Sequence, residues 1–131
     1  MRTSVGIVLV SHSPLLGAGV AELTEQLGGG GVAVAVAAGT EAGEIGTSYE
    51  LIEAAVRQVD SGAGVVVLPD LGSAVLTARA VLADLAREDE VVLVDAPFVE
   101  GAVAAVVTAS TGAGLAEVAR SAREAWQSRK F

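Results

Sequence analysis

Short apolar runs alternate along the chain with longer segments whose apolar positions recur at helical spacing. The apolar runs are residues 5–10, 32–37, 64–68 and 91–94, and the helical segments are 15–27, 47–60, 73–87, 98–110 and 113–128. The runs are rich in Val and contain almost no polar residue, which is typical of parallel strands buried on both faces. The alternation predicts an α/β fold, with helices covering both faces of one parallel sheet.

The order of the strands follows from the rules for parallel connections. Right-handed crossovers between four strands give a small doubly wound sheet, and we expect the order 2-1-3-4. Gly-rich turns at 28–31 and 60–64 separate helices from the strands that follow, and no segment has the composition of a linker. We therefore expect a single domain over residues 1–131.

The only histidine of the chain lies where the first apolar run ends. His12 stands in the sequence Ser11-His12-Ser13-Pro14, between the first predicted strand and the first predicted helix. Ligands of doubly wound sheets bind at this carboxyl edge of the strands, and the start of a helix attracts anions. Asp70 follows the third run, so the expected strand order places it beside His12.

A histidine paired with an aspartate can act as a nucleophile. A carboxylate that accepts the Nδ1 proton fixes the ring tautomer, leaves Nε2 free, and stabilises the cation that forms when Nε2 attacks. We therefore expect His12 and Asp70 to be catalytic. Each residue alone also has a structural interpretation, with His12 as a capping or packing residue and Asp70 as the N-cap of the next helix.

A phosphoryl group on His12 would need amide and hydroxyl donors around its oxygens, because no Lys lies in this part of the chain. The candidate donors follow the first three runs, and they are Ser13, Gly39, Thr40, Gly46, Thr47, Gly72 and Ser73. Leu15, Leu16, Leu71 and Val75 lie around the same site. These four side chains either face the core or form a hydrophobic ring that receives a partner protein.

Composition excludes several classes of function. The formal net charge of −8, with a single Lys, argues against nucleic acid as a partner. The chain has no Cys, which excludes disulfides and thiolate chemistry, and its acidic residues lack the spacing of a metal site. The first apolar run is too short for a signal peptide or a membrane span, which predicts a cytoplasmic protein without a membrane partner.

Five segments of the sequence together carry a family resemblance. They are Val10-Ser11-His12-Ser13 with Leu16-Gly17-Ala18-Gly19-Val20, Ala37-Ala38-Gly39, Ile45-Gly46-Thr47-Ser48, Asp70-Leu71-Gly72-Ser73-Ala74, and Ala96-Pro97-Phe98-Val99-Glu100-Gly101. Over nearly its whole length the chain resembles the phosphotransfer subunits of bacterial dihydroxyacetone kinases that run on the phosphoenolpyruvate:sugar phosphotransferase system. Those subunits belong to the mannose-type IIA family, and the resemblance implies a homodimer with an α/β fold.

The resemblance implies a phosphotransferase whose covalent intermediate is a phosphohistidine. His12 would accept the phosphoryl group at Nε2 from the histidine phosphocarrier protein, supported by Asp70, and pass it to ADP on the nucleotide-binding subunit of dihydroxyacetone kinase. This chain would bind no cofactor of its own, since ADP, ATP and magnesium belong to that partner subunit. Two alternatives stay open: a IIA component that feeds a sugar transporter, and a non-catalytic regulatory domain.

Overall fold

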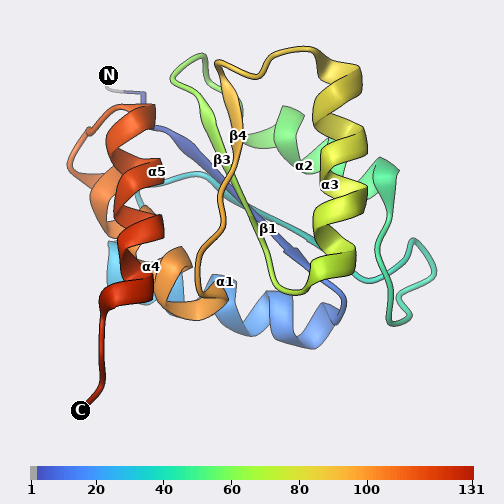
Figure 1. The fold of residues 1–131 in the computed structure, drawn as a ribbon, viewed down its shortest axis with the longest axis horizontal. Helices are drawn as coiled ribbons and strands as arrows, with labels where there is room; N and C mark the ends of the chain where they lie inside the picture. Colours follow the sequence, from blue (N-terminus) through green and yellow to red (C-terminus); the bar gives the residue numbers. More distant parts are fainter. Residues whose placement is uncertain (1–2) are drawn as a thin grey trace.

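Four parallel strands form one sheet in the computed structural model, which describes residues 3–131 (Figure 1). The strands are β1 (Gly6–Ser11), β2 (Val34–Ala38), β3 (Val65–Pro69) and β4 (Val91–Leu93). Their order across the sheet is β2-β1-β3-β4, and every neighbouring pair is parallel. The predicted α/β fold and the strand order 2-1-3-4 are confirmed.

Helices follow each strand, as the alternating pattern predicted. Within residues 3–131 they are α1 (Pro14–Gly28), α2 (Tyr49–Val59), α3 (Gly72–Leu85), α4 (Phe98–Ser110), α5 (Leu115–Glu124) and a 3-10 turn (Ala125–Gln127). The largest difference from the prediction is at the last segment, where the α-helix ends early and tightens into the 3-10 turn. No helix in this range combines the length and the apolar character needed to cross a membrane.

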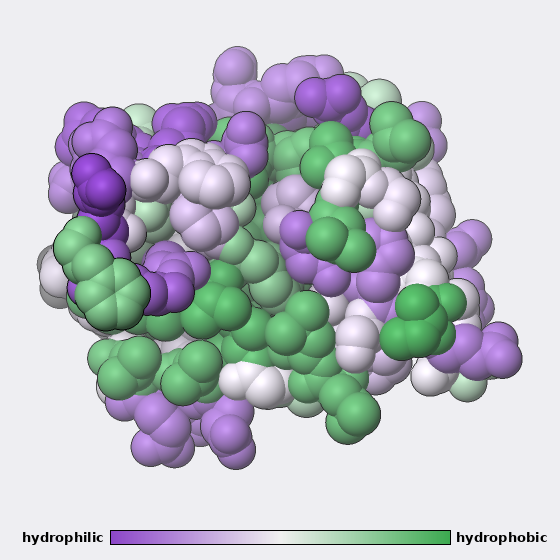
Figure 2. Space-filling view, turned by 60° about the horizontal axis from the view of Figure 1, so that its bottom comes forward, coloured by the Kyte–Doolittle hydropathy of each residue, from purple (hydrophilic) through white to green (hydrophobic). Residues whose placement is uncertain are grey.

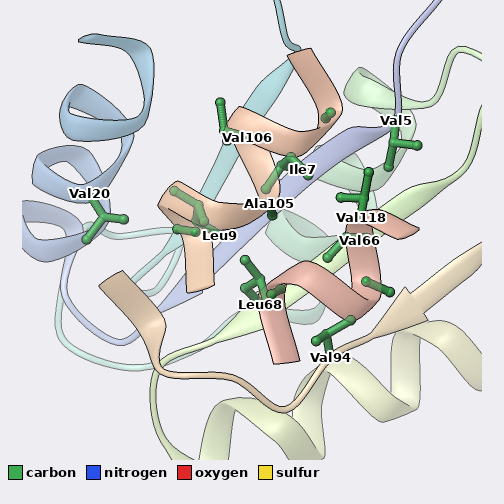
Figure 3. Close-up of a cluster of buried hydrophobic side chains, with 14 residues drawn as sticks. Val5, Ile7, Leu9, Val20, Val66, Leu68, Val94, Ala105, Val106 and Val118 are labelled. Atoms are coloured by element: carbon green, nitrogen blue, oxygen red, sulfur yellow. The ribbon is translucent and has the colours of Figure 1, made fainter. Parts of the chain in front are cut away.

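The sheet separates two apolar cores, because neighbouring residues of a strand point to opposite faces. Ile7 and Leu9 of β1 pack with side chains of α1, α4 and α5 on one face (Figure 3). Val8 and Val10 pack beneath α2 and α3 on the other face. Helices on both faces therefore hold β1 rigidly from its start to its end at Ser11.

All four strands run in the same direction, so the turns that lead from strands into helices all lie at one edge of the sheet. The register pairs Val10 with Pro69 and Ser11 with Ala38. The residues that follow these pairs therefore lie together at this edge. Pro69 ends β3, as expected of a residue that has no N–H for the next ladder bond.

Candidate active site

His12 is held in place from several directions at the carboxyl edge of the sheet. Its ring Nδ1 lies 2.9 Å from Asp70 Oδ1, and its backbone N–H donates to Asp70 Oδ2 at 3.0 Å. Its carbonyl oxygen accepts a hydrogen bond from the Gly46 amide at 3.0 Å. The side chain keeps 17% of its surface exposed, so the ring is fixed and still reachable from solvent. The structure thus brings together the two residues that the strand order placed side by side.

Asp70 accepts four hydrogen bonds, two on each carboxylate oxygen. Oδ1 faces His12 Nδ1 and accepts the Leu71 amide at 2.7 Å, while Oδ2 accepts the His12 amide and the Ser11 hydroxyl, both at 3.0 Å. Four acceptor contacts match the capacity of an ionised carboxylate. Because an ionised carboxylate has no proton to give, Nδ1 of His12 must carry the shared proton. The lone pair of the ring then lies on Nε2.

The hydrogen bonds around Asp70 also set its acidity. Burial raises the pKa of this carboxyl, but the hydrogen bonds from His12, Ser11 and Leu71 together lower it by more. The net result is a pKa below the ordinary value of 3.8. Asp70 therefore stays ionised throughout the neutral range and can stabilise a positively charged imidazole.

This lowered pKa predicts how the stability of the protein depends on pH. The unfolded chain takes up a proton at Asp70 near pH 3.8, and the folded chain only at a lower pH, so acid favours unfolding. The stabilisation is complete above the unfolded value and is lost as the pH falls through the folded value. Below about pH 4 we expect the free energy of unfolding of the wild type to fall more steeply than that of Asp70→Asn, measured by urea denaturation.

The exposed Asp89 provides the control for this measurement. Asp89→Asn removes the same formal charge without touching the site, so its unfolding free energy should follow the wild-type slope with pH. Equal slopes for wild type and Asp70→Asn would contradict the effect assigned to the four hydrogen bonds of Asp70.

The other ring nitrogen faces the start of α3. Nε2 of His12 contacts the hydroxyl of Ser73, the second residue of that helix. The N-cap residue Leu71 makes no side-chain cap bond, and the first amides of a helix, here from Gly72 and Ser73, have no intrahelical acceptor. The unprotonated nitrogen therefore lies beside a hydroxyl and uncapped amides, an environment that favours an anion.

Two of the predicted donors have other partners in the structure. The Gly39 amide donates to the Ser11 carbonyl at 2.9 Å, and the Gly46 amide donates to the His12 carbonyl. Gly39 has a φ of +70°, and a Cβ at this position would lie 2.5 Å from the Glu44 carbonyl oxygen, so this turn requires glycine. Both amides already have acceptors, and the two glycines shape the loop that supports His12.

Some of the predicted hydroxyl donors also have other partners in the structure, and others keep a proton that they can donate. The Thr47 hydroxyl is hydrogen-bonded to Thr77 of α3, and the Thr40 hydroxyl accepts the Glu44 amide within the β2–α2 loop, which leaves the Thr40 hydroxyl proton available. The Ser13 hydroxyl caps α1 by accepting an amide, which leaves its own proton available to donate. Among the predicted donors, Ser73 is the one whose side chain contacts the His12 ring within residues 3–131.

Ser11 also belongs to the site, although the sequence did not single it out. Its side chain is fully buried, with 0% exposure, donates to Asp70 Oδ2, and accepts the Ser13 amide at 3.1 Å. A buried hydroxyl needs partners, and a Ser at the end of an otherwise apolar strand was the available signal. Ser11 thus fixes the carboxylate that in turn orients His12.

Comparison with known proteins places this site in a family. The model of the EIIA-man family, described as the PTS system fructose IIA component, matches residues 6–119. The phosphoryl donor subunit DhaM of the PEP-dependent dihydroxyacetone kinase of Klebsiella michiganensis is 40% identical over 96% of this chain, and that of Escherichia coli is 39% identical over 96%. The chain spans only 28% of the length of these two relatives.

Other relatives match the chain over most of their own length. The phosphoryl donor subunit DhaM of PEP-dependent dihydroxyacetone kinase 2 from Listeria innocua is 33% identical over 79% of this chain and 84% of its own. A crystal structure of EF1359, a protein of unknown function, superposes with a TM-score of 0.86 at 30% identity, covering 100% of this chain and 99% of the other. The chain therefore belongs to the EIIA-man family and is related to the DhaM phosphotransfer subunits of PTS-dependent dihydroxyacetone kinases.

Proposed function

We propose that this protein is a cytoplasmic phosphohistidine carrier of the phosphotransferase system. His12 accepts a phosphoryl group from the histidine phosphocarrier protein and passes it to ADP on the nucleotide-binding subunit of dihydroxyacetone kinase. The chain binds no nucleotide or metal itself, because ADP, ATP and magnesium are held by that subunit. The observation that carries the proposal is the hydrogen bond between His12 Nδ1 and Asp70, which leaves Nε2 unprotonated at the start of α3.

In the first half-reaction the lone pair of Nε2 attacks the phosphorus of the carrier's phosphohistidine. The bond between that phosphorus and the carrier's ring breaks, and its electron pair returns to the carrier. The His12 ring now bears a positive charge, which the Asp70 carboxylate stabilises through the Nδ1 proton. In the second half-reaction an oxygen of the terminal phosphate of ADP attacks the phosphorus, the bond to Nε2 breaks, and ATP forms.

The phosphoryl group on Nε2 needs donors for its three outer oxygens during both steps. The amides of Gly72 and Ser73 and the hydroxyls of Ser13 and Ser73 are the groups that support this role. The Ser73 hydroxyl contacts Nε2 in the unphosphorylated protein, so it must turn aside when the phosphorus arrives. Positioning and electrostatic stabilisation of this kind account for most of the catalysis of phosphoryl transfer.

A labelling experiment tests this proposal directly. The protein is incubated with labelled phosphoenolpyruvate, enzyme I and the phosphocarrier, and then with the ADP-loaded kinase subunit. We expect a phosphate that is labile in acid and stable in alkali, followed by its appearance in ATP. A failure to label would support the regulatory-domain alternative, and a label that moves to a sugar transporter but not to ADP would support the IIA alternative.

Exposed leucines beside the site support docking of both partners at this edge. Leu15, Leu16 and Leu71 are exposed by 86%, 44% and 61%, so the alternative that they face the core is wrong for these three. Val75 is partly buried. We expect Leu15→Asp and Leu71→Asp each to lower the rate of transfer about tenfold or more, because a charged side chain in an apolar contact is costly.

Transfer rates measured by rapid quench at several partner concentrations check this prediction. Leu15→Met keeps an apolar side chain of similar size and should retain the wild-type rate. Unchanged rates for both aspartate variants would remove these leucines from the docking surface.

We also propose the homodimer that the family resemblance implies, formed through α1 and α4. Leu23 and Leu27 of α1 and Val99 and Val107 of α4 are exposed and border one groove. Figure 2 shows a band of apolar surface on the face turned forward from the bottom of Figure 1, where α1 lies. Apolar patches of this kind mark protein interfaces. Sedimentation equilibrium should give twice the chain mass of 13.0 kDa, and a monomer would contradict this.

A further inference from the structure

A pocket of about 350 Å³ opens directly beside the candidate active site, between the ends of β3 and β4. Asp70 and Gly72 line the side that faces His12, Val75 and Leu93 contribute apolar surface, and the lining also includes Arg79, Trp126 and a second acidic residue, Asp95. The site residues therefore form one wall of this pocket. The mechanism described above uses neither Arg79 nor Trp126.

Arg79 is a cation with no partner in this pocket. Arg79 is exposed and, like Arg120, Arg123 and Arg129 but unlike Arg57, Arg87 and Lys130, makes no hydrogen bond or ion pair with any of residues 3–131. Gly72, Val75 and Arg79 are three and four positions apart, so they lie on one face of α3. Cα–Cβ bonds of a helix tilt toward its start, so a side chain as long as that of Arg79 can reach toward the Gly72 end of the pocket.

A partner that reaches His12 must also cover this pocket. A protein–protein contact of ordinary size buries about 800 Å² on each side, a patch roughly 30 Å across. The pocket shares Asp70 and Gly72 with the site, so it falls inside any such contact centred on Nε2. Trp and Arg are also the residues that contribute most strongly to interfaces when a partner covers them.

The two partners bring different charges to this contact. The phosphocarrier contributes one anionic group, the phosphoryl group itself, which ends on Nε2 beside Ser73. The acceptor subunit brings a further anion, the diphosphate of ADP. This diphosphate must approach a phosphorylated imidazole on a chain of net charge −8. Magnesium on that subunit offsets part of the charge of the diphosphate, and a cation of this chain beside the line of approach would lower the remaining repulsion between the two anions.

We propose that Arg79 is this cation, and that the pocket it lines receives the diphosphate of the nucleotide presented by the acceptor subunit. The inference rests on the proposed function. The terminal phosphate oxygen forms its bond to phosphorus as the Nε2–P bond breaks, and the Arg79 guanidinium binds the phosphate oxygens that do not react. Arg79 is thereby specific to the acceptor half-reaction.

Separate measurement of the two half-reactions tests the proposal. For Arg79→Gln we expect the rate of transfer from phosphorylated His12 to the ADP-loaded subunit to fall about tenfold or more, and phosphorylation by the phosphocarrier to change less than about twofold. Arg79→Lys keeps the charge and should recover part of the acceptor rate. Arg57→Gln removes the same charge at the far end of α2, near the opposite edge of the sheet, and should leave both rates unchanged.

A second measurement uses Trp126, the only tryptophan of the chain, as a probe of binding. With 5-fluorotryptophan at this position, 19F NMR titrations measure binding of the acceptor subunit with and without its nucleotide. We expect Arg79→Gln to weaken binding only when ADP is present. If Arg79→Gln weakened binding equally with and without nucleotide, the guanidinium would pair with an acidic side chain of the subunit. That result would overturn the proposal.

The remaining outcomes are also decisive. Equal slowing of both half-reactions, or no slowing of the acceptor step, would overturn the role of Arg79. Failure of the proposed function gives a different result, because the wild-type protein would then take up no phosphate or transfer none to ADP.

Discussion

Replacing His12 with glutamine is expected to abolish phosphorylation of the protein, with the label falling to background. Glutamine has a similar length and keeps a polar end, but its amide nitrogen has no free lone pair for attack on phosphorus. His12 is the only histidine and the chain has no cysteine, so no other side chain can form a phosphohistidine or a phosphocysteine. The measurement is the labelling assay with enzyme I and the phosphocarrier.

The stability of the label to acid provides the control for this experiment. A phosphate on the Ser73 hydroxyl, which contacts Nε2, would resist acid, whereas a phosphohistidine would not. Circular dichroism and thermal unfolding should show that His12→Gln remains folded, because the side chain is partly exposed and belongs to neither core. Acid-labile label that persisted in the folded variant would contradict the role of His12.

The second large effect is expected for Asp70→Asn, which should slow phosphoryl transfer by about two orders of magnitude or more. The asparagine amide keeps the size of the side chain but loses the negative charge that stabilises the imidazolium. It can also donate a hydrogen bond to Nδ1, which would place the ring proton on Nε2 and remove the nucleophile. Rapid-quench rates of phosphorylation by the phosphocarrier measure this effect.

Asp70→Ala provides a second test of the same carboxylate. Alanine removes the charge without offering a donor, so the ring can still adopt the reactive tautomer. We therefore expect Asp70→Ala to be slowed but to remain faster than Asp70→Asn. The Asp89→Asn variant should keep the wild-type rate. If Asp70→Asn transferred phosphate at the wild-type rate, the electrostatic role of the carboxylate would be wrong.

Much of the fold could be predicted because the signals were local and repeated. Val-rich runs with few polar residues predict buried parallel strands, and the handedness of crossovers leaves few ways to order four of them. The ends of the elements were less predictable, since competing backbone hydrogen bonds set them. The 3-10 turn that begins at Ala125 is an example, because its sequence continues the helical pattern of α5.

The candidate site was predictable only in part, for a physical reason. His12 and Asp70 follow neighbouring strands, so strand order alone brings them together. The hydrogen bonds of the loops depend on backbone conformation, which explains why Gly39 and Gly46 have other acceptors for their amides. Ser11 depends on which side the last residue of a strand faces, where periodicity is least informative, and Arg79, in the middle of α3, depends on the pocket that the ends of β3 and β4 form beside that helix.

The most direct test of the central claim is to identify which ring nitrogen of His12 carries the phosphoryl group. The Asp70 carboxylate holds the Nδ1 proton, so phosphorus should bond to Nε2. Long-range 1H–15N correlation spectra of the 15N-labelled, phosphorylated protein distinguish the two nitrogens through their chemical shifts and phosphorus couplings. The account predicts a phosphoryl group on Nε2 with the proton kept on Nδ1, and a phosphoryl group on Nδ1 would contradict it.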